Sequence, residues 1–286
     1  MLKSREIKAI AKKAMLPHKK LIYGGTIIIL ILYNVIKWLL SNMGDSSDII
    51  SLAVDIFVFG IFGITISNFF LQLVRENGAD AKIVYDIMPD YGKKLAVNLL
   101  RTVYLVLWTL LFVIVSVIII ALASMINRII SIVLLTIAII GLFVFITNRT
   151  YLYSLAPYVY ADNPNLSAGM ILAKSVKLMK GNVWKKIRLD LSFWPWVLAN
   201  VFTYIVTVMT IALASLEYVD FGYFMEPLLT TASTFIGTIV IMNVAGFIIF
   251  LISVYYIPYQ KASEAVFYGE TVNKLNALYG GEYTIN

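Results

Sequence analysis

The chain has 286 residues, of which 60% are apolar and 14% charged, and its formal net charge is +7. A soluble domain is about 45–50% apolar and about 25% charged, so this composition excludes one and indicates a protein surrounded by lipid. The chain has no cysteine and only one histidine, which excludes disulfides and cysteine- or histidine-rich metal centres. No phosphate-binding loop of the G-x-x-x-x-G-K-[ST] type occurs, and we expect neither a metal nor another cofactor.

Six apolar stretches are each long enough for an α-helix that crosses about 30 Å of hydrocarbon. They lie at about 21–40, 49–74, 102–125, 129–151, 191–216 and 228–257. The sequence therefore predicts an all-α, polytopic membrane protein with six transmembrane helices in three hairpins. Residues 1–286 are expected to form a single integral membrane domain.

The distribution of positive charge predicts how these helices are oriented. Of the 23 Lys and Arg residues, 21 fall at junctions on one side of the six spans, and only Lys37 and Arg128 lie near the other. Junctions rich in Lys and Arg stay in the cytoplasm, so both termini should be cytoplasmic, and the connection at 217–226, which has no basic residue, should be outside. We therefore assign the basic charge to membrane topology and anionic lipid, not to nucleic acid.

A cytoplasmic amphipathic helix is predicted ahead of each hairpin, at 7–15, 84–91 and 168–179, where apolar residues recur at helical spacing. Paired lysines follow each of these segments. Helices with a basic face lie among the lipid headgroups and attract anionic lipid. Because any inward-facing junction gathers lysines, a threefold repeat is one of two interpretations that stay open. The lysines expected to contact headgroups are Lys12, Lys13, Lys93, Lys94, Lys180, Lys185 and Lys186.

Four charged residues fall inside or at the ends of the spans, where a charge usually has a partner and often a role. Asp55 lies about 10 Å below the outer surface at helical rise, and Lys37 lies at a similar depth on the preceding span, so the two should pair or share a wet cavity. Arg101 and Asp190, at the inner ends of their spans, are expected to meet likewise. These four are the candidate substrate-binding residues, and a purely structural salt bridge is the alternative for each pair. No catalytic carboxylate pair is present among them.

Three segments of the chain carry a resemblance to a known family: SVKLMKGNVWKK from Ser175 to Lys186, LDLSFWPW ending at Trp196, and YIPYQKASEAVFY from Tyr256 to Tyr268. They resemble the Gram-positive integral membrane proteins grouped as domain of unknown function 975 (DUF975). More distantly, they are similar to the membrane domain attached to some glycerophosphodiester phosphodiesterases. At 16–18 the chain has Leu-Pro-His where that family tends to have Gly-Asn-Trp. The resemblance implies six spans in a bacterial plasma membrane and no established activity.

Two functions agree with these features. The first is a non-enzymatic, multi-pass protein that binds lipid or amphipathic molecules, in envelope maintenance or in resistance to membrane-active peptides. The alternative is a transporter or permease component for a small or lipid-like substrate, since transporters often place polar groups at membrane depth. An intramembrane hydrolase is disfavoured because a His or carboxylate dyad is missing, so we expect no enzyme. The expected partners are anionic membrane lipids, and a homo-oligomer or a partner membrane protein stays open.

Overall fold

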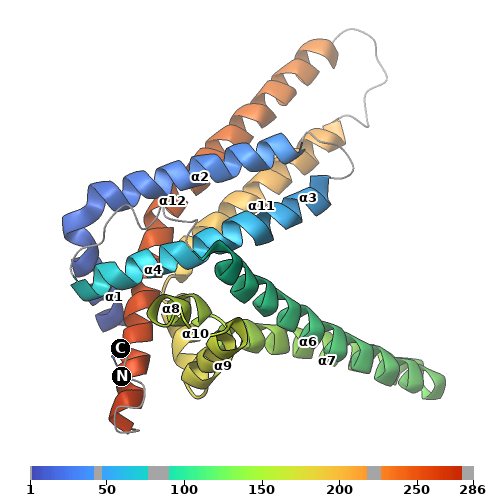
Figure 1. The fold of residues 1–286 in the computed structure, drawn as a ribbon. Coiled ribbons are helices and arrows are strands. Elements are labelled where there is room, and N and C mark those ends of the chain that lie inside the picture. Colours follow the sequence, from blue (N-terminus) through green and yellow to red (C-terminus); the bar gives the residue numbers. More distant parts are fainter. Residues whose placement is uncertain (1, 42–46, 77–89, 218–226, 279–286) are drawn as a thin grey trace.

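The computed structural model describes residues 2–41, 47–76, 90–217 and 227–278 (Figure 1). Within these ranges every regular element is a helix and no strand occurs, which confirms the predicted all-α class. The helices are α1 (Ser4–Met15), α2 (Lys19–Ser41), α3 (Ser47–Val54), α4 (Gly60–Glu76), α6 (Tyr91–Ile126), α7 (Arg128–Leu152), α8 (Ala156–Asp162), α9 (Ala168–Met179), α10 (Val183–Leu191), α11 (Trp194–Glu217) and α12 (Pro227–Leu278). A 3₁₀ turn (Leu16–His18) joins α1 to α2, and a π-helical segment (Asp55–Phe59) joins α3 to α4.

Membrane-length helices dominate the described part of the chain. Five stretches there are long and apolar enough to cross a bilayer: Ser4–Leu40, Ile49–Arg75, Tyr91–Ile126, Arg128–Asp162 and Val244–Ala277. The remaining predicted span, 191–216, corresponds to α11, which begins at Trp194 because a turn after α10 occupies the residues before it. Helices of this length and composition indicate a membrane protein.

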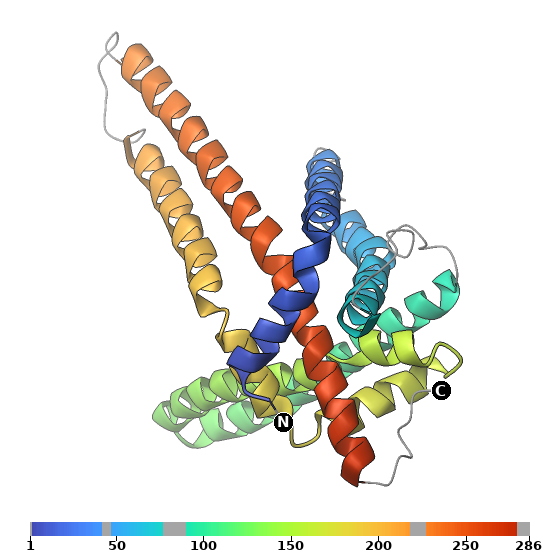
Figure 2. The ribbon, with the colours of Figure 1, turned by 90° about the vertical axis from the view of Figure 1, so that its left-hand side faces the viewer.

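The long helices lie in pairs that point in different directions (Figures 1 and 2). Helices α6 and α7 pack along one another, as do α11 and α12. The α6–α7 pair extends away from the α11–α12 pair, and α2 and α3 form a third arm. Along α6 and α7 many large apolar side chains are exposed, among them Leu107, Leu111, Ile119 and Ile139. Such a surface suits lipid and not water.

The core lies at the foot of these arms, where α1, α4, α8, α9, α10 and α12 meet. Tyr158 of α8 and Tyr268 of α12 are almost fully buried, and their rings stack with centroids 5.7 Å apart. The apolar part of α12 was predicted to end near residue 257, yet the helix continues to Leu278. It does so because Ala262, Ala265 and Phe267 are buried in this core.

Two of the predicted amphipathic segments are helices whose apolar faces pack inside the protein. Helix α1 buries Ile7, Ala11 and Met15 and packs mainly on α12. Helix α9 likewise packs against α6 and α8. The predicted segment at 84–91 lies outside the described residues up to residue 89, and so does the connection at 218–226. The apolar faces of α1 and α9 therefore contact protein, and two of their lysines do so as well, since Lys8 donates to the carbonyl of Ser192 and Lys174 to the side chain of Asn163.

Candidate functional site

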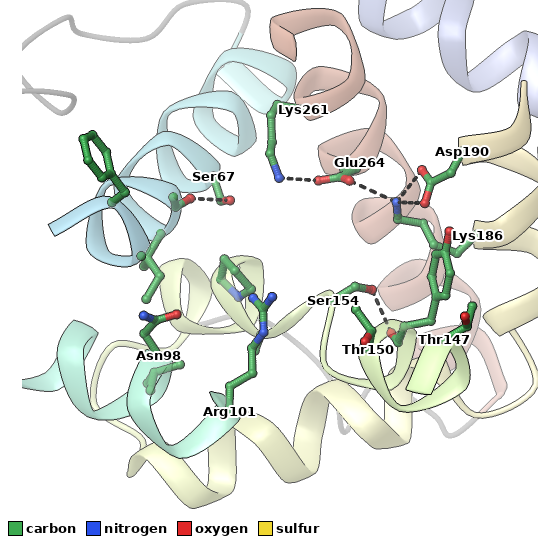
Figure 3. Close-up of a pocket in the computed structure, with 18 of the residues that line it drawn as sticks. Ser67, Asn98, Arg101, Thr147, Thr150, Ser154, Lys186, Asp190, Lys261 and Glu264 are labelled. Carbon is green, nitrogen blue, oxygen red and sulfur yellow. Dashed lines mark hydrogen bonds and ion pairs between the residues drawn. The ribbon is translucent and has the colours of Figure 1, made fainter. Parts of the chain in front are cut away.

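A polar cavity of about 560 Å³ lies where α4, α6, α7, α8, α10 and α12 meet (Figure 3). Its charged lining consists of Arg101, Lys186, Asp190, Lys261 and Glu264. Its neutral polar lining includes Ser67, Asn98, Thr147, Thr150 and Ser154. A cavity of this size with convergent polar groups is the usual form of a small-molecule site.

Lys186 is the centre of an ion network on one wall of the cavity. Its Nζ donates hydrogen bonds to both carboxylate oxygens of Asp190, at 2.7 and 2.9 Å, and to Oε1 of Glu264 at 3.0 Å. Lys261 donates to Oε2 of Glu264 at 2.9 Å, and the hydroxyl of Tyr158 donates to the same oxygen at 3.2 Å. The network therefore ties α10 and α8 to α12, across more than 70 residues of sequence.

Lys186 stays charged inside this network. Its residue is 2% exposed, and burial by itself lowers the pKa of the amine. The carboxylates of Glu264 and Asp190 outweigh burial and raise the Lys186 pKa above its ordinary value. Lys186 is therefore a permanent cation that anchors two carboxylates, and it is unsuited to accept a proton during a reaction.

Arg101 lines the same cavity from α6 but takes no part in the network. Its side chain points into the space enclosed by the lining residues (Figure 3). Among the residues that the structure describes, Arg101 has no hydrogen-bond or ion-pair partner, and Glu264 acts on it only through space. The cavity thus contains a guanidinium whose donors are not used by the protein.

A close contact between α4 and α6 shapes the adjoining wall. The π-helical turn leaves backbone carbonyls without their usual donors, and α6 supplies replacements. Asn98 Nδ2 donates to the carbonyl of Ile56 at 2.8 Å, and the Tyr91 hydroxyl donates to that of Phe57 at 3.2 Å. Gly60 makes the approach possible, because a Cβ at this position would overlap the Asn98 amide.

A second cluster of charged and polar residues, outside the lining of the cavity, joins α4, α8 and α12. Arg75 of α4 pairs with the Asp162 carboxylate of α8 through two bonds, at 2.5 and 2.9 Å. The Tyr268 hydroxyl of α12 donates to the same carboxylate at 2.6 Å. The Asp162 side chain is 3% exposed and that of Arg75 is 35% exposed, so a buried carboxylate with three charged or polar bonds connects the three helices.

An apolar groove of about 320 Å³ lies between α2, α4 and α12. Its lining is mostly aliphatic and aromatic, and the one threonine in it, Thr26, donates its hydroxyl to the carbonyl of Ile22 within α2. Phe59, at the end of the π-helical segment, lines both this groove and the polar cavity. The groove and the cavity therefore flank α4 and share one aromatic side chain.

The sequence was compared with models of known protein families. The profile of the family described as "Protein of unknown function (DUF975)" matches residues 1–275. The chain belongs to the DUF975 family. Comparisons with curated proteins and with solved structures gave no significant match. The predicted family is confirmed, and its relation to glycerophosphodiester phosphodiesterases stays a prediction.

One of the two predicted charge pairs is present in this DUF975 protein. Lys37 Nζ of α2 lies 2.6 Å from Oδ2 of Asp55 and also donates to the Ser51 hydroxyl. The other pair is not formed. Arg101 and Asp190 line the same cavity, but Lys186 holds both oxygens of Asp190. A lysine four residues away on the same helix reaches this carboxylate more easily than an arginine on α6 does.

The lysines predicted to contact headgroups divide into two groups. Lys12, Lys13, Lys180 and Lys185 are exposed, and Lys93 is half-buried. The remaining two require a correction, because Lys94 is 7% exposed and Lys186 is 2% exposed. Their side chains are inside the protein and are removed from the set that can reach lipid.

Sequence reasoning also missed Glu264 and Lys261, which come after the last predicted span of this DUF975 chain. One signal for them was available: the charged pair interrupts a run of small and apolar residues, Ala262, Ser263 and Ala265, that has helical spacing. A carboxylate on the apolar side of such a run requires a buried partner.

Proposed function

We propose that this DUF975 protein is a non-enzymatic, multi-pass protein of the bacterial plasma membrane that binds lipid or another amphipathic molecule. Six helices in three hairpins cross the membrane, and both termini lie in the cytoplasm. Binding serves envelope maintenance or resistance to membrane-active peptides. The observation that carries this proposal is that a polar cavity and an apolar groove flank α4 and share Phe59 as a wall.

The two sites together match the two halves of an amphipathic ligand. Apolar pockets of about 300–1,000 Å³ with a few polar groups are typical of small-molecule binding, and both volumes fall in that range. The groove has no charged residue in its lining, so it suits a hydrocarbon chain. The cavity has five charged residues, so it suits a polar headgroup.

The distribution of charge supports a site at the inner leaflet. Arg101, Lys186 and Lys261 belong to the side of the spans that carries 21 of the 23 basic residues, which the positive-inside rule assigns to the cytoplasm. Exposed lysines such as Lys12 and Lys180 lie on the same side, where they attract anionic headgroups. A ligand would therefore enter from the cytoplasmic leaflet.

The proposed protein is not an enzyme because both carboxylates of the cavity are bound by lysines. Asp190 and Glu264 are both held by lysines, so neither is free to act as a general acid or base. In the described ranges no group of three His, Asp or Glu side chains could hold a metal ion. The cavity is therefore better suited to binding than to bond cleavage.

A transporter or permease component is the second candidate, and the Lys37–Asp55 pair favours it. Asp55 begins the π-helical segment, and Phe59 at the other end of that segment reaches the cavity. Irregular helices near a polar site recur in transporters. Uptake or efflux by vesicles containing the purified protein would distinguish transport from binding.

Filling the groove tests the proposed function. Gly25 lines the groove and Gly24 does not, and a Cβ at either position meets open space. Gly25→Phe should lower the fraction of protein that carries dioleoylphosphatidylglycerol several-fold in native mass spectrometry, whereas Gly24→Phe should leave it unchanged. If the wild-type chain retained no lipid, or if both variants bound lipid equally, the proposal would be wrong.

A further inference from the structure

The charges in the polar cavity do not cancel. Three cations and two carboxylates line it, which leaves one positive charge in excess. Both lysines are committed: Lys186 bonds Asp190 and Glu264, and Lys261 bonds Glu264. The carboxylate oxygens already accept these bonds and one from Tyr158. The excess charge is therefore that of Arg101.

Arg101 carries its charge at an energetic cost. Its side chain is half-buried at the inner end of a membrane-length helix, and within the described chain no carboxylate or carbonyl accepts its donors. A charge withdrawn from water without a partner is unfavourable by several kcal/mol. An anion that enters the cavity would remove this cost, because the five donors of a guanidinium match a planar or tetrahedral oxyanion.

Two hydroxyls in the cavity are also unused. Thr147 and Thr150 line it from α7, and neither has a hydrogen-bond partner in the part of the chain that the structure describes. The other hydroxyls are occupied, since Ser154 donates to the carbonyl of Tyr151 and Ser67 to that of Gly63. Among the described lining residues, Arg101 is thus the charged one without an ion-pair partner, and Thr147 and Thr150 add two unused hydroxyls (Figure 3).

We infer that this cavity binds one singly charged phosphate group, with Arg101 as the ion-pairing residue and Thr147 and Thr150 as additional donors. One anion neutralises the one uncompensated charge, and the volume of about 560 Å³ admits a headgroup as well as a bare phosphate. Basic pockets between helices on the cytoplasmic side bind the phosphates of anionic lipids. The inference rests on the proposed function and specifies the headgroup class of its ligand.

The test compares Arg101→Gln with Arg128→Gln, a control at the exposed far end of the α6–α7 pair. Native mass spectrometry or titration calorimetry of the full chain in detergent measures dioleoylphosphatidylglycerol and dioleoylphosphatidylcholine separately. Arg101→Gln should weaken phosphatidylglycerol binding at least about tenfold, as expected for the loss of a charged hydrogen-bonded pair. The phosphatidylglycerol affinity of Arg101→Lys should lie between those of Arg101→Gln and the wild type, and the affinity of Arg128→Gln should equal that of the wild type.

Inorganic phosphate distinguishes the two sources of the anion. Displacement of the lipid by millimolar phosphate supports the phosphate site. If the protein binds phosphate in an Arg101-dependent way but binds no lipid, the phosphate site is also supported, and the lipid part of the proposed function is overturned. Lipid binding that Arg101→Gln leaves unchanged overturns the inference alone. Absence of both lipid and phosphate binding in the wild type overturns both proposals.

A thermal unfolding measurement separates binding from a structural role. Without ligand, Arg101→Gln should be as stable as the wild type or more stable, because it removes an uncompensated charge. If this variant is less stable than Arg128→Gln without ligand, Arg101 supports the fold and the inference fails.

Discussion

Replacing Lys186 with methionine tests how the ion network holds the inner helices together. Methionine keeps the length and the apolar stem of lysine but removes the charge and all three hydrogen bonds to Asp190 and Glu264. Glu264 keeps its bond to Lys261. Asp190 loses both of its bonds and its only ion-pair partner and keeps the Tyr151 hydroxyl alone, so this carboxylate accounts for most of the expected loss.

The expected loss of unfolding free energy is about 3 kcal/mol. Removing one partner of a buried ion pair costs about 3–5 kcal/mol. The lower end applies because the Asp190 and Glu264 side chains are 19% and 12% exposed, so water partly relieves them. The variant Lys186→Met/Asp190→Asn removes the orphaned charge and should recover part of the loss, since buried pairs replaced as a whole are often neutral.

Thermal unfolding in detergent, followed by intrinsic fluorescence, is the assay. Lys186→Met should lower the midpoint by roughly 6–12 °C, by the scaling for large single domains. The control is Lys180→Met, because Lys180 is an exposed lysine at the end of α9, and its effect should stay within about 0.5 kcal/mol. Equal midpoints for the two variants would refute the structural role of the network.

Two further substitutions test local packing and the outer ion pair by the same assay. Gly60→Ala should destabilise by about 1–3 kcal/mol, because the new methyl group overlaps the Asn98 amide. Gly63→Ala, with open space at its Cβ, should be neutral or stabilising, and equal losses at both glycines would contradict the close approach. Asp55→Asn should cost about 1 kcal/mol or less, since the Asp55 and Lys37 side chains are 40% and 25% exposed. A loss as large as that of a buried pair would contradict this.

The long helices were predictable because a bilayer demands a fixed length of apolar chain. Five of the six predicted stretches recur among the membrane-length helices of the described chain. The contact between Lys37 and Asp55 was predictable for the same reason, since both lie at a known depth from the same end of adjacent helices. The depth of a residue in the membrane follows from its distance along the helix from the end of the span, which can be counted in the sequence.

The inner site was less predictable because it depends on which helices meet. Lys186 and Glu264 are 78 residues apart and bond across two helices, and no periodic pattern contains that distance. Lys185 and Lys186 are adjacent lysines that the sequence does not distinguish, yet Lys185 is exposed and Lys186 is buried. Local spacing identified the turn at Gly181, whose φ of +78° favours glycine at the end of α9.

The central claim is that the basic side of the helices, with its polar cavity, faces the cytoplasm. The chain has no cysteine, so single cysteines report position without background. Labelling of intact cells with a membrane-impermeant maleimide should modify Arg128→Cys, whereas Ser4→Cys and Lys180→Cys should react only after permeabilisation. Labelling of Ser4→Cys or Lys180→Cys in intact cells, with Arg128→Cys protected, would contradict this orientation and the inner-leaflet site derived from it.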